Sequence, residues 1–228
     1  MDYLALATDY DGTLATGGQV AASTVTALKR FIDAGGTAIL VTGRELPDLK
    51  SVFPQLELFQ RVVAENGALL YRPESEEEIL LCEPPNAELV SQLRERGVPV
   101  SVGRSVVATV EPHHTAVLEF IHELGLELQV VFNKGSVMVL PTGVNKATGL
   151  MQALKELAIK PEQVVAVGDG ENDHALLAAC GFGVAVANAV TPLKQRADLV
   201  TSSADGAGVA ELISRVLAGD LAQLPRRK

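Results

Sequence analysis

Two aspartates one residue apart, Asp9 and Asp11, form the segment most suited to chemistry, and a glycine follows them directly. If the preceding strand continues through them, its two-residue period places both carboxylates on the same side. Such a pair can divide labour, with one carboxylate as nucleophile or metal ligand and the other as general acid and base. An Asx-type turn after a strand is the competing interpretation. A calcium EF-hand loop fits poorly, because its sixth and twelfth positions counted from Asp9 are Leu14 and Val20.

A second polar cluster, Thr42-Gly43-Arg44, stands just before a predicted helix that opens with Glu45. The start of a helix offers free N–H groups and a positive potential, which suit a phosphate. An ordinary N-cap threonine is the alternative. Arg44 is unfavourable at the positive end of a helix unless an anion is nearby, so the cluster favours phosphate binding.

A third cluster contains Asp169, Asn172 and Asp173 where a loop enters a helix. Oxygen ligands at this spacing suit a hard cation such as Mg²⁺, although the helix dipole also favours an acidic first turn without any ligand. Lys146 begins an amphipathic helix, where it could neutralise a nucleophilic carboxylate and a bound phosphate. A solvated surface lysine is the common interpretation of such a residue.

The strands that must position these clusters are short, continuous apolar runs, typical of strands buried on both faces of a parallel sheet. The runs are Leu4–Thr8, Thr37–Val41, Arg61–Ala64, Val164–Val167 and Phe182–Val186. Helical patterns alternate with them, which predicts an α/β fold with a doubly wound, Rossmann-like parallel sheet. All three clusters follow the carboxyl ends of strands, where ligands bind in such sheets, so we expect them to converge.

The alternation changes between residues 83 and 142, which predict a small α+β module on an antiparallel sheet. Its expected elements are a helix over 86–96, strands around 98–102 and 106–110, a helix over 113–124, and a hairpin over 128–140 that turns at 133–135. We interpret 83–142 as an inserted cap domain, with 1–82 and 143–228 as the catalytic core. The tail at 225–228 is expected to fray.

Composition excludes several functional classes. The 228 residues carry a formal charge of −9, with six Phe, three Tyr and no Trp, which makes a nucleic-acid partner unexpected. No apolar run reaches the ~18–20 residues of a membrane span, and the N-terminus does not resemble a signal peptide, so we expect a cytoplasmic protein without membrane contact. Cys82 and Cys180 fit neither a zinc nor a disulfide pattern and are expected to be reduced.

In order and spacing, the clusters resemble the four motifs of haloacid dehalogenase-like phosphohydrolases, over nearly the whole chain. The matching residues are Asp9, Asp11, Gly12 and Thr13; then Thr42, Gly43 and Arg44; then Lys146; then Gly168, Asp169, Asn172 and Asp173. Accessory segments resemble the type IIB (Cof-like) branch, whose cap is inserted between the second and third motifs. These segments are Glu65-Asn66-Gly67-Ala68, Asn188-Ala189, Lys194 and Ala197-Asp198. Within that branch the chain is similar to archaeal-type phosphoglycolate phosphatases and small sugar phosphatases.

The resemblance implies that Asp9 attacks phosphorus to form an aspartyl-phosphate, while Asp11 protonates the leaving alcohol and then activates water. It implies a Mg²⁺ ion held by Asp9, the backbone carbonyl of Asp11 and Asp169, with Asp173 a ligand or an orienting residue. Electrostatics agrees, because one pair of like unit charges 4 Å apart repels by ~4 kcal/mol at an effective dielectric constant near 20. A phosphate dianion therefore needs a cation to approach these carboxylates.

The same resemblance assigns the phosphate to Thr42, Gly43, Arg44 and Asn172, and implies that Asn172 also orients the metal carboxylates. Lys146 would screen the nucleophile and the transferred group. The expected substrate is a small phosphorylated metabolite, such as phosphoglycolate or a sugar phosphate, and the expected state is a monomer or homodimer.

Three other classes share part of this pattern. A phosphomutase would carry all four motifs but usually a larger cap, and a receiver-type signalling domain lacks the second aspartate and the cap. A non-catalytic phosphate-binding module is disfavoured because no motif position is degraded. In the cap, Arg104, Lys134, His113 and His114 could contact a substrate carboxylate or hydroxyl, although solvated turn or helix-end roles are more common; with His122, the two histidines form no recognisable zinc pattern.

Overall fold

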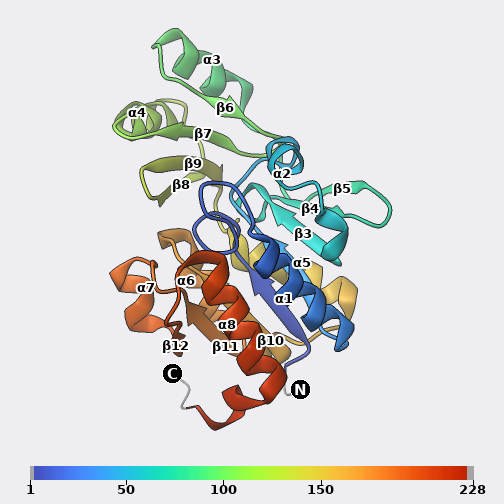
Figure 1. Ribbon diagram of the computed structural model, residues 1–228. Helices are drawn as coiled ribbons and strands as arrows, with labels where there is room; N and C mark the ends of the chain where they lie inside the picture. Colours follow the sequence, from blue (N-terminus) through green and yellow to red (C-terminus); the bar gives the residue numbers. More distant parts are fainter. Residues whose placement is uncertain (1–2, 225–228) are drawn as a thin grey trace.

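The computed structural model describes residues 3–224, so the tail predicted to fray lies outside the described residues (Figure 1). Its larger sheet has eight strands. In spatial order they are β12 (Leu199–Val200), β11 (Phe182–Ala185), β10 (Val164–Gly168), β1 (Ala5–Thr8), β2 (Thr37–Val41), β3 (Arg61–Ala64), β4 (Leu69–Arg72) and β5 (Glu77–Leu80).

The six strands from β12 to β3 are parallel, and the five from β11 to β3 are the buried apolar runs that the sequence predicts. The α/β, Rossmann-like fold class is therefore confirmed. The sheet extends beyond the predicted strands at both edges: β12 adds a short parallel strand at one, and β4 and β5 run antiparallel at the other. The β5 sequence, Glu-Glu-Ile-Leu, is largely exposed at the edge of the sheet, so it lacks the apolar run by which the inner strands were recognised.

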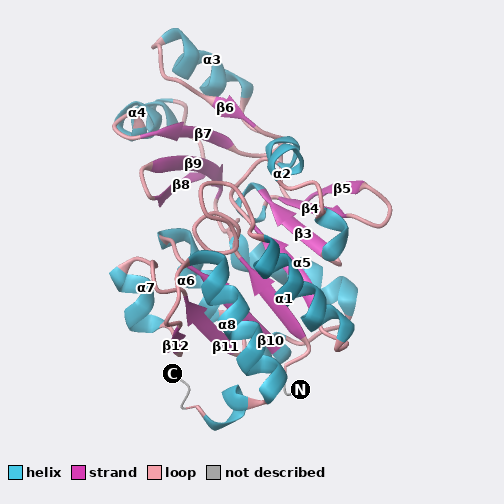
Figure 2. Ribbon diagram, in the orientation of Figure 1, coloured by secondary structure: helices cyan, strands magenta, loops and turns pink. Residues whose placement is uncertain are grey.

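Helices cover both faces of this sheet (Figure 2). On one face α1 (Ala22–Asp33) and α8 (Asp205–Ala218) pack against each other, and behind the sheet α5 (Lys146–Leu157) and α6 (His174–Ala178) do the same. Outside residues 83–142, the other helical segments described are α2 (Leu46–Val52), α7 (Thr191–Arg196), and the short 3₁₀ turns η1 (Leu56–Leu58), η2 (Glu65–Gly67), η3 (Pro161–Gln163), η4 (Glu171–Asp173) and η5 (Asp220–Gln223). Within 3–224, no helix combines the length and apolar character needed to cross a bilayer.

A second, antiparallel sheet of four strands lies beyond the carboxyl edge of the first (Figure 1). Its strands, in the order β6-β7-β9-β8, are β6 (Ser101–Val102), β7 (Val107–Val110), β9 (Ser136–Pro141) and β8 (Leu128–Asn133). With α3 (Ala87–Glu95) and α4 (His114–Glu123) it buries an apolar core of its own, including Leu93, Val107 and Val117. The element order is the expected one, and the division into core and cap domains stays a prediction.

Candidate active site

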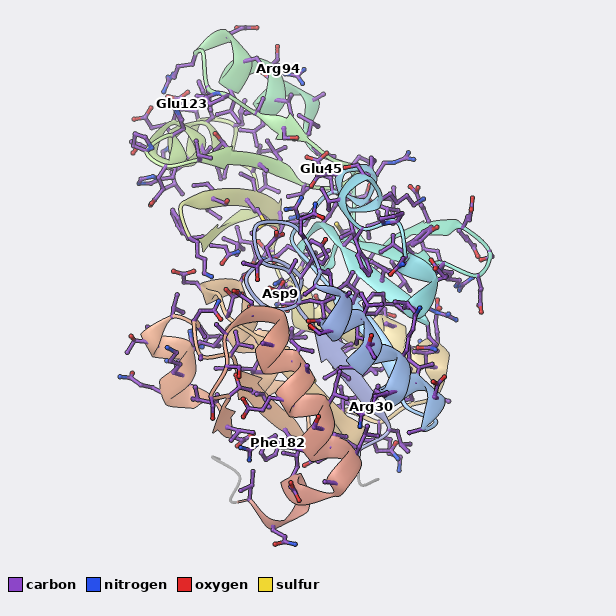
Figure 3. All side chains as sticks on the ribbon, in the orientation of Figure 1. Asp9, Arg30, Glu45, Arg94, Glu123 and Phe182 are labelled. Carbon is purple, nitrogen blue, oxygen red and sulfur yellow. The ribbon has the colours of Figure 1, made fainter. Side chains whose placement is uncertain are left out.

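The order β10-β1-β2 at the centre of the large sheet brings the predicted polar clusters together. Asp169 follows β10, Asp9 follows β1 and Thr42 follows β2, and the three strands are parallel. Their carboxyl ends therefore meet at one edge, the position at which open α/β sheets bind ligands. Figure 3 labels Asp9 at this edge, on the side of the large sheet nearest the second sheet.

Three buried carboxylates form the centre of the site. One oxygen each from Asp9, Asp169 and Asp173 lies within 4.8 Å of the other two. Asp173 Oδ2 accepts hydrogen bonds from the backbone N–H groups of Asp169 and Gly170, both at 2.9 Å, and Asp169 Oδ1 accepts one from Thr13 Oγ1 at 2.9 Å. An oxygen-only set of this kind suits a hard divalent cation.

Lys146 supplies the positive charge that balances this cluster. Its Nζ donates to Asp9 Oδ1 at 2.6 Å and to Asp173 Oδ1 at 2.7 Å, and only 1% of its side chain is exposed. It is the first residue of α5, whose start is held by a reciprocal capping box between Asn145 and Thr148. The common interpretation of a solvated surface lysine is therefore wrong at this position, because the start of α5 lies within hydrogen-bond distance of Asp9 and Asp173.

Burial and charge act in opposite directions on this ion pair. Burial raises the pKa of Asp9 well above its ordinary value, and nearby Asp173 and Asp169 add to that effect while Lys146 opposes it. For Lys146, burial lowers the pKa, but Asp173 and Asp9 outweigh burial and raise the pKa above its ordinary value. Lys146 therefore stays charged.

The side chain of Asp11 lies apart from the three buried carboxylates. It is 43% exposed and receives a bidentate ion pair from Arg44, with Nε–Oδ2 at 2.6 Å and Nη2–Oδ1 at 2.7 Å. The expectation that Asp9 and Asp11 share one side required the strand to continue, but β1 ends at Thr8 and the chain turns at Gly12, whose φ is +75°. The predicted contact of Asp11 with a metal is therefore restricted to its backbone carbonyl.

The anion inferred beside Arg44 is present within the protein itself. Besides Asp11, Arg44 pairs with Asp48 at 2.5 Å. Hydrogen bonding to Asp11 is the main cause that raises the pKa of Arg44 above its ordinary value, although burial opposes it. Its position at a helix start thus needs no bound phosphate, and Arg44 acts first as the residue that orients Asp11.

Thr42 and Asn172 come together through Asn66, a residue that the site prediction missed. Asn172 Nδ2 donates to Asn66 Oδ1 at 2.9 Å, and the Asn66 backbone N–H donates to the Thr42 carbonyl at 2.9 Å. Within 3–224, Asn66 Nδ2 and Asn172 Oδ1 are buried without a hydrogen-bond partner, which marks space for a polar ligand. The accessory segment at 65–68 was the available signal, and the left-handed backbone of Asn66, with φ +55°, is what turns it into the site.

Of the four cap residues considered from the sequence, Lys134 is the one seen at the acidic cluster. Its ammonium pairs with Asp169, whereas the Arg104 side chain pairs with exposed Glu78, and the His114 ring contacts a cap phenylalanine. A second link joins the segment at 83–142 to the rest of the chain: the buried Glu65 carboxylate accepts backbone N–H groups from residues 104, 105 and 106 at 3.0, 2.8 and 3.2 Å.

Comparison with known proteins identifies the family to which the chain belongs. Residues 6–98 and 119–213 match the family model of haloacid dehalogenase-like hydrolases. The chain is 30% identical over 222 residues to phosphoglycolate phosphatase 2 of Saccharolobus solfataricus, covering 94% of this chain and 93% of that one. It is 34% identical to the phosphoglycolate phosphatase of Methanothermobacter thermautotrophicus, with coverage of 93% and 98%.

Solved structures agree on the fold. A haloacid dehalogenase-like hydrolase from Bacteroides thetaiotaomicron superposes with a TM-score of 0.80 at 22% identity, covering 94% of this chain and 99% of that one. A sugar phosphatase of subclass IIB of the same superfamily superposes with a TM-score of 0.78 at 22% identity, with coverage of 93% and 98%. At this identity the likeness concerns the fold.

Proposed function

The chain belongs to the haloacid dehalogenase-like hydrolases and is a phosphatase of that family, and on this premise we propose that it hydrolyses small phosphorylated metabolites with Mg²⁺ through an aspartyl-phosphate. The observation that carries the proposal is the buried Asp9 carboxylate, held by Lys146 at the carboxyl edge of the sheet beside two further acids. Cytoplasmic location and a monomeric or homodimeric state stay predictions.

Asp9 is the nucleophile in this proposal. Lys146 orients one of its oxygens, so the other can form a bond to phosphorus as the bond to the leaving alcohol breaks. Asp11, half exposed at the mouth and oriented by Arg44, gives a proton to the leaving oxygen. In the second step Asp11 takes a proton from water as the water oxygen attacks phosphorus, and Asp9 is released as a carboxylate.

The chain's own residues would hold both the metal and the phosphate. Asp9, Asp169 and the backbone carbonyl of Asp11 would bind Mg²⁺, which supplies the positive charge that a phosphate dianion needs beside these acids. Both oxygens of Asp173 already accept hydrogen bonds, so an orienting role suits it better than direct ligation.

The phosphate would lie against Thr42, Gly43 and Asn172, beside Arg44, where the unpaired Nδ2 of Asn66 adds a donor. Residues 83–142 would act as the cap. Closing over a phosphate site, such a cap excludes water and leaves room for a compact leaving group. The phosphoglycolate phosphatases among the relatives support a substrate of this size, and phosphoglycolate is our first candidate.

The covalent intermediate provides the direct test. Asp11→Asn is incubated with p-nitrophenyl phosphate, whose leaving group needs little acid assistance, and the protein is digested and analysed by mass spectrometry. We expect a phosphoryl group on the peptide that contains Asp9, because turnover of the intermediate loses the ~10²–10⁴-fold contribution of the general base. Asp9→Asn should carry no label, and Asp33→Asn, an exposed acid at the end of α1, should behave as wild type. Label on Asp11 in the wild type, or on Asp9→Asn, would reverse the two roles.

A substrate panel tests the second half of the proposal. Free phosphate is measured with phosphoglycolate, sugar phosphates and a phosphopeptide as substrates. Small esters should give the higher kcat/KM values, because the closed cap excludes a peptide. A phosphopeptide that outperforms every small ester would contradict the role assigned to the cap.

A further inference from the structure

The tip of the β8–β9 hairpin reaches from the second sheet into the site of the first. Its turn is formed by Asn133, Lys134 and Gly135, with Lys134 in the left-handed region at φ +47°. The Lys134 backbone N–H donates to the carboxylate of Glu171 at 3.2 Å, and the Lys134 ammonium pairs with Asp169 Oδ2. A hairpin of the second sheet therefore places a positive charge at the acidic cluster of the first.

Two glycines of the core leave room for this tip. A Cβ on Gly12 would lie 3.0 Å from Lys134 Nζ, and a Cβ on Gly170 would lie 2.2 Å from Asn133 Oδ1. Both glycines belong to the loops that follow β1 and β10, so the tip lies against the same loops that carry the nucleophile and the acidic cluster. Asn133 Oδ1 is buried against Gly170 and has no hydrogen-bond partner among residues 3–224.

Lys134 differs from the two other cations at the site in being more exposed and in pairing with a single carboxylate. Lys146 is buried and shared by two carboxylates, and Arg44 is held by two others. The Lys134 side chain is 41% exposed, so it lies at the outer side of the cluster, where the leaving group of a phosphate ester would emerge.

The present partner of Lys134 is also a proposed metal ligand. A divalent cation at Asp169 repels an ammonium group, and two cations cannot occupy the same carboxylate oxygen. With such a cation bound, the Lys134 ammonium would have to leave Asp169 and pair with another anion nearby. A carboxylate on the leaving group would be such an anion, within reach of a flexible side chain anchored by its own backbone at Glu171.

We propose that Lys134 is a specificity-determining residue that selects phosphate esters whose leaving group carries a carboxylate. The inference rests on the proposed function and names its substrate class: a compact ester with a second negative charge. The ammonium pairs with that charge and holds the leaving group over Asp9.

The experiment compares two esters of similar size, 2-phosphoglycolate and 2-hydroxyethyl phosphate, which differ in the charge of the leaving group. In Lys134→Gln, kcat/KM for 2-phosphoglycolate should fall by ~10–100-fold, the usual effect of losing a hydrogen bond to a charged group. For 2-hydroxyethyl phosphate it should change by less than about threefold, as for a surface substitution. Lys134→Arg should retain part of the preference for the charged ester.

Arg104→Gln is the matched control, because it removes a positive charge from another cap turn that pairs with exposed Glu78. It should leave both esters unaffected. Binding is measured separately by calorimetry in the Asp9→Asn background with Mg²⁺, where no turnover occurs. Adding Lys134→Gln in that background should weaken the binding of 2-phosphoglycolate. The binding of 2-hydroxyethyl phosphate should not change.

The other possible outcomes of this experiment would contradict the inference. An equal fall in kcat/KM for both esters would mean that Lys134 holds the cap closed without contacting the leaving group. The inference would then fail. Unchanged kinetics on both esters would also overturn it. If the wild type hydrolyses 2-hydroxyethyl phosphate and shows no preference for 2-phosphoglycolate, the inference is refuted. The proposed function would still stand. If the wild type hydrolyses no phosphate ester, the proposed function fails and the inference with it.

Discussion

Replacing Lys146 with methionine separates the electrostatic role of this residue from its packing role. The variant keeps a flexible apolar chain of similar length but removes the ammonium that lies 2.6 Å from Asp9 and 2.7 Å from Asp173. Two buried carboxylates then have no counter-charge from α5. Removing one partner of a buried ion pair costs ~3–5 kcal/mol, against a total stability of ~5–15 kcal/mol. The variant should fold, with a melting temperature lower by about 6–20 °C, since 1 kcal/mol shifts a chain of this size by ~2–4 °C.

The loss should depend on pH in a defined direction. Burial already raises the pKa of Asp9, and without Lys146 nothing on α5 opposes that rise. A carboxyl group whose folded pKa exceeds its unfolded value near ~3.9 destabilises the fold fully above the folded pKa, and the penalty fades as pH falls toward the unfolded value. The difference between wild type and variant should therefore be large at pH 8 and should shrink as the pH falls toward about 4.

Urea denaturation followed by circular dichroism, in EDTA and over this pH range, measures the effect. Lys155→Met, an exposed lysine on the same helix, is the control and should change stability by less than about 0.5 kcal/mol. Added Mg²⁺ should recover part of the loss in Lys146→Met, because a cation in the acidic cluster replaces the missing charge. Turnover should fall by ~10²–10³-fold, as for other lost transition-state contacts. Equal destabilisation at every pH would show that packing, not charge, is responsible, and wild-type stability at pH 8 would refute the argument outright.

The remaining predictions concern the metal and two glutamates, Glu65 and Glu156. Excess EDTA should abolish phosphate release and Mg²⁺ should restore it, and full activity in protein shown to be metal-free by elemental analysis would contradict the metal assignment. Glu65→Gln places an amide N–H against the backbone donors of residues 104–106 and should lower the free energy of unfolding by about 1–3 kcal/mol; an unchanged midpoint in urea would argue against this link. Glu156 bridges Arg61 and Arg72, and hydrogen bonding to Arg72 lowers its pKa. That stabilisation is fully present above the unfolded pKa near ~4.3 and is lost as the pH falls through the folded value. Glu156→Gln should therefore lose about 1 kcal/mol or less at pH 7 and progressively less as the pH falls below about 4. A loss that is the same at every pH would contradict this.

Much of the scaffold is encoded in local patterns that can be recognised in the sequence. A strand such as Thr37–Val41 is apolar throughout because both of its faces are buried, and that run needs no knowledge of its neighbours. The polar residues that follow such strands are predicted to converge for the same reason, since parallel strands bring their carboxyl ends to one edge. The short antiparallel strand Glu77–Leu80 escaped prediction because an exposed edge strand leaves no such apolar pattern.

The partners of the charged residues were decided only by the tertiary structure. Lys146 and Asp9 are 137 positions apart, and the sequence of α5 alone is equally compatible with a lysine in solvent. Arg44 was correctly seen to need an anion, but the fold supplies Asp11 from a loop 33 positions away. Lys134 reaches Asp169 because a hairpin of one sheet meets a loop of the other. A local pattern reports whether a side chain is polar and how often it recurs, whereas burial and ion pairing depend on which distant segments the packed chain brings within a few ångströms of it.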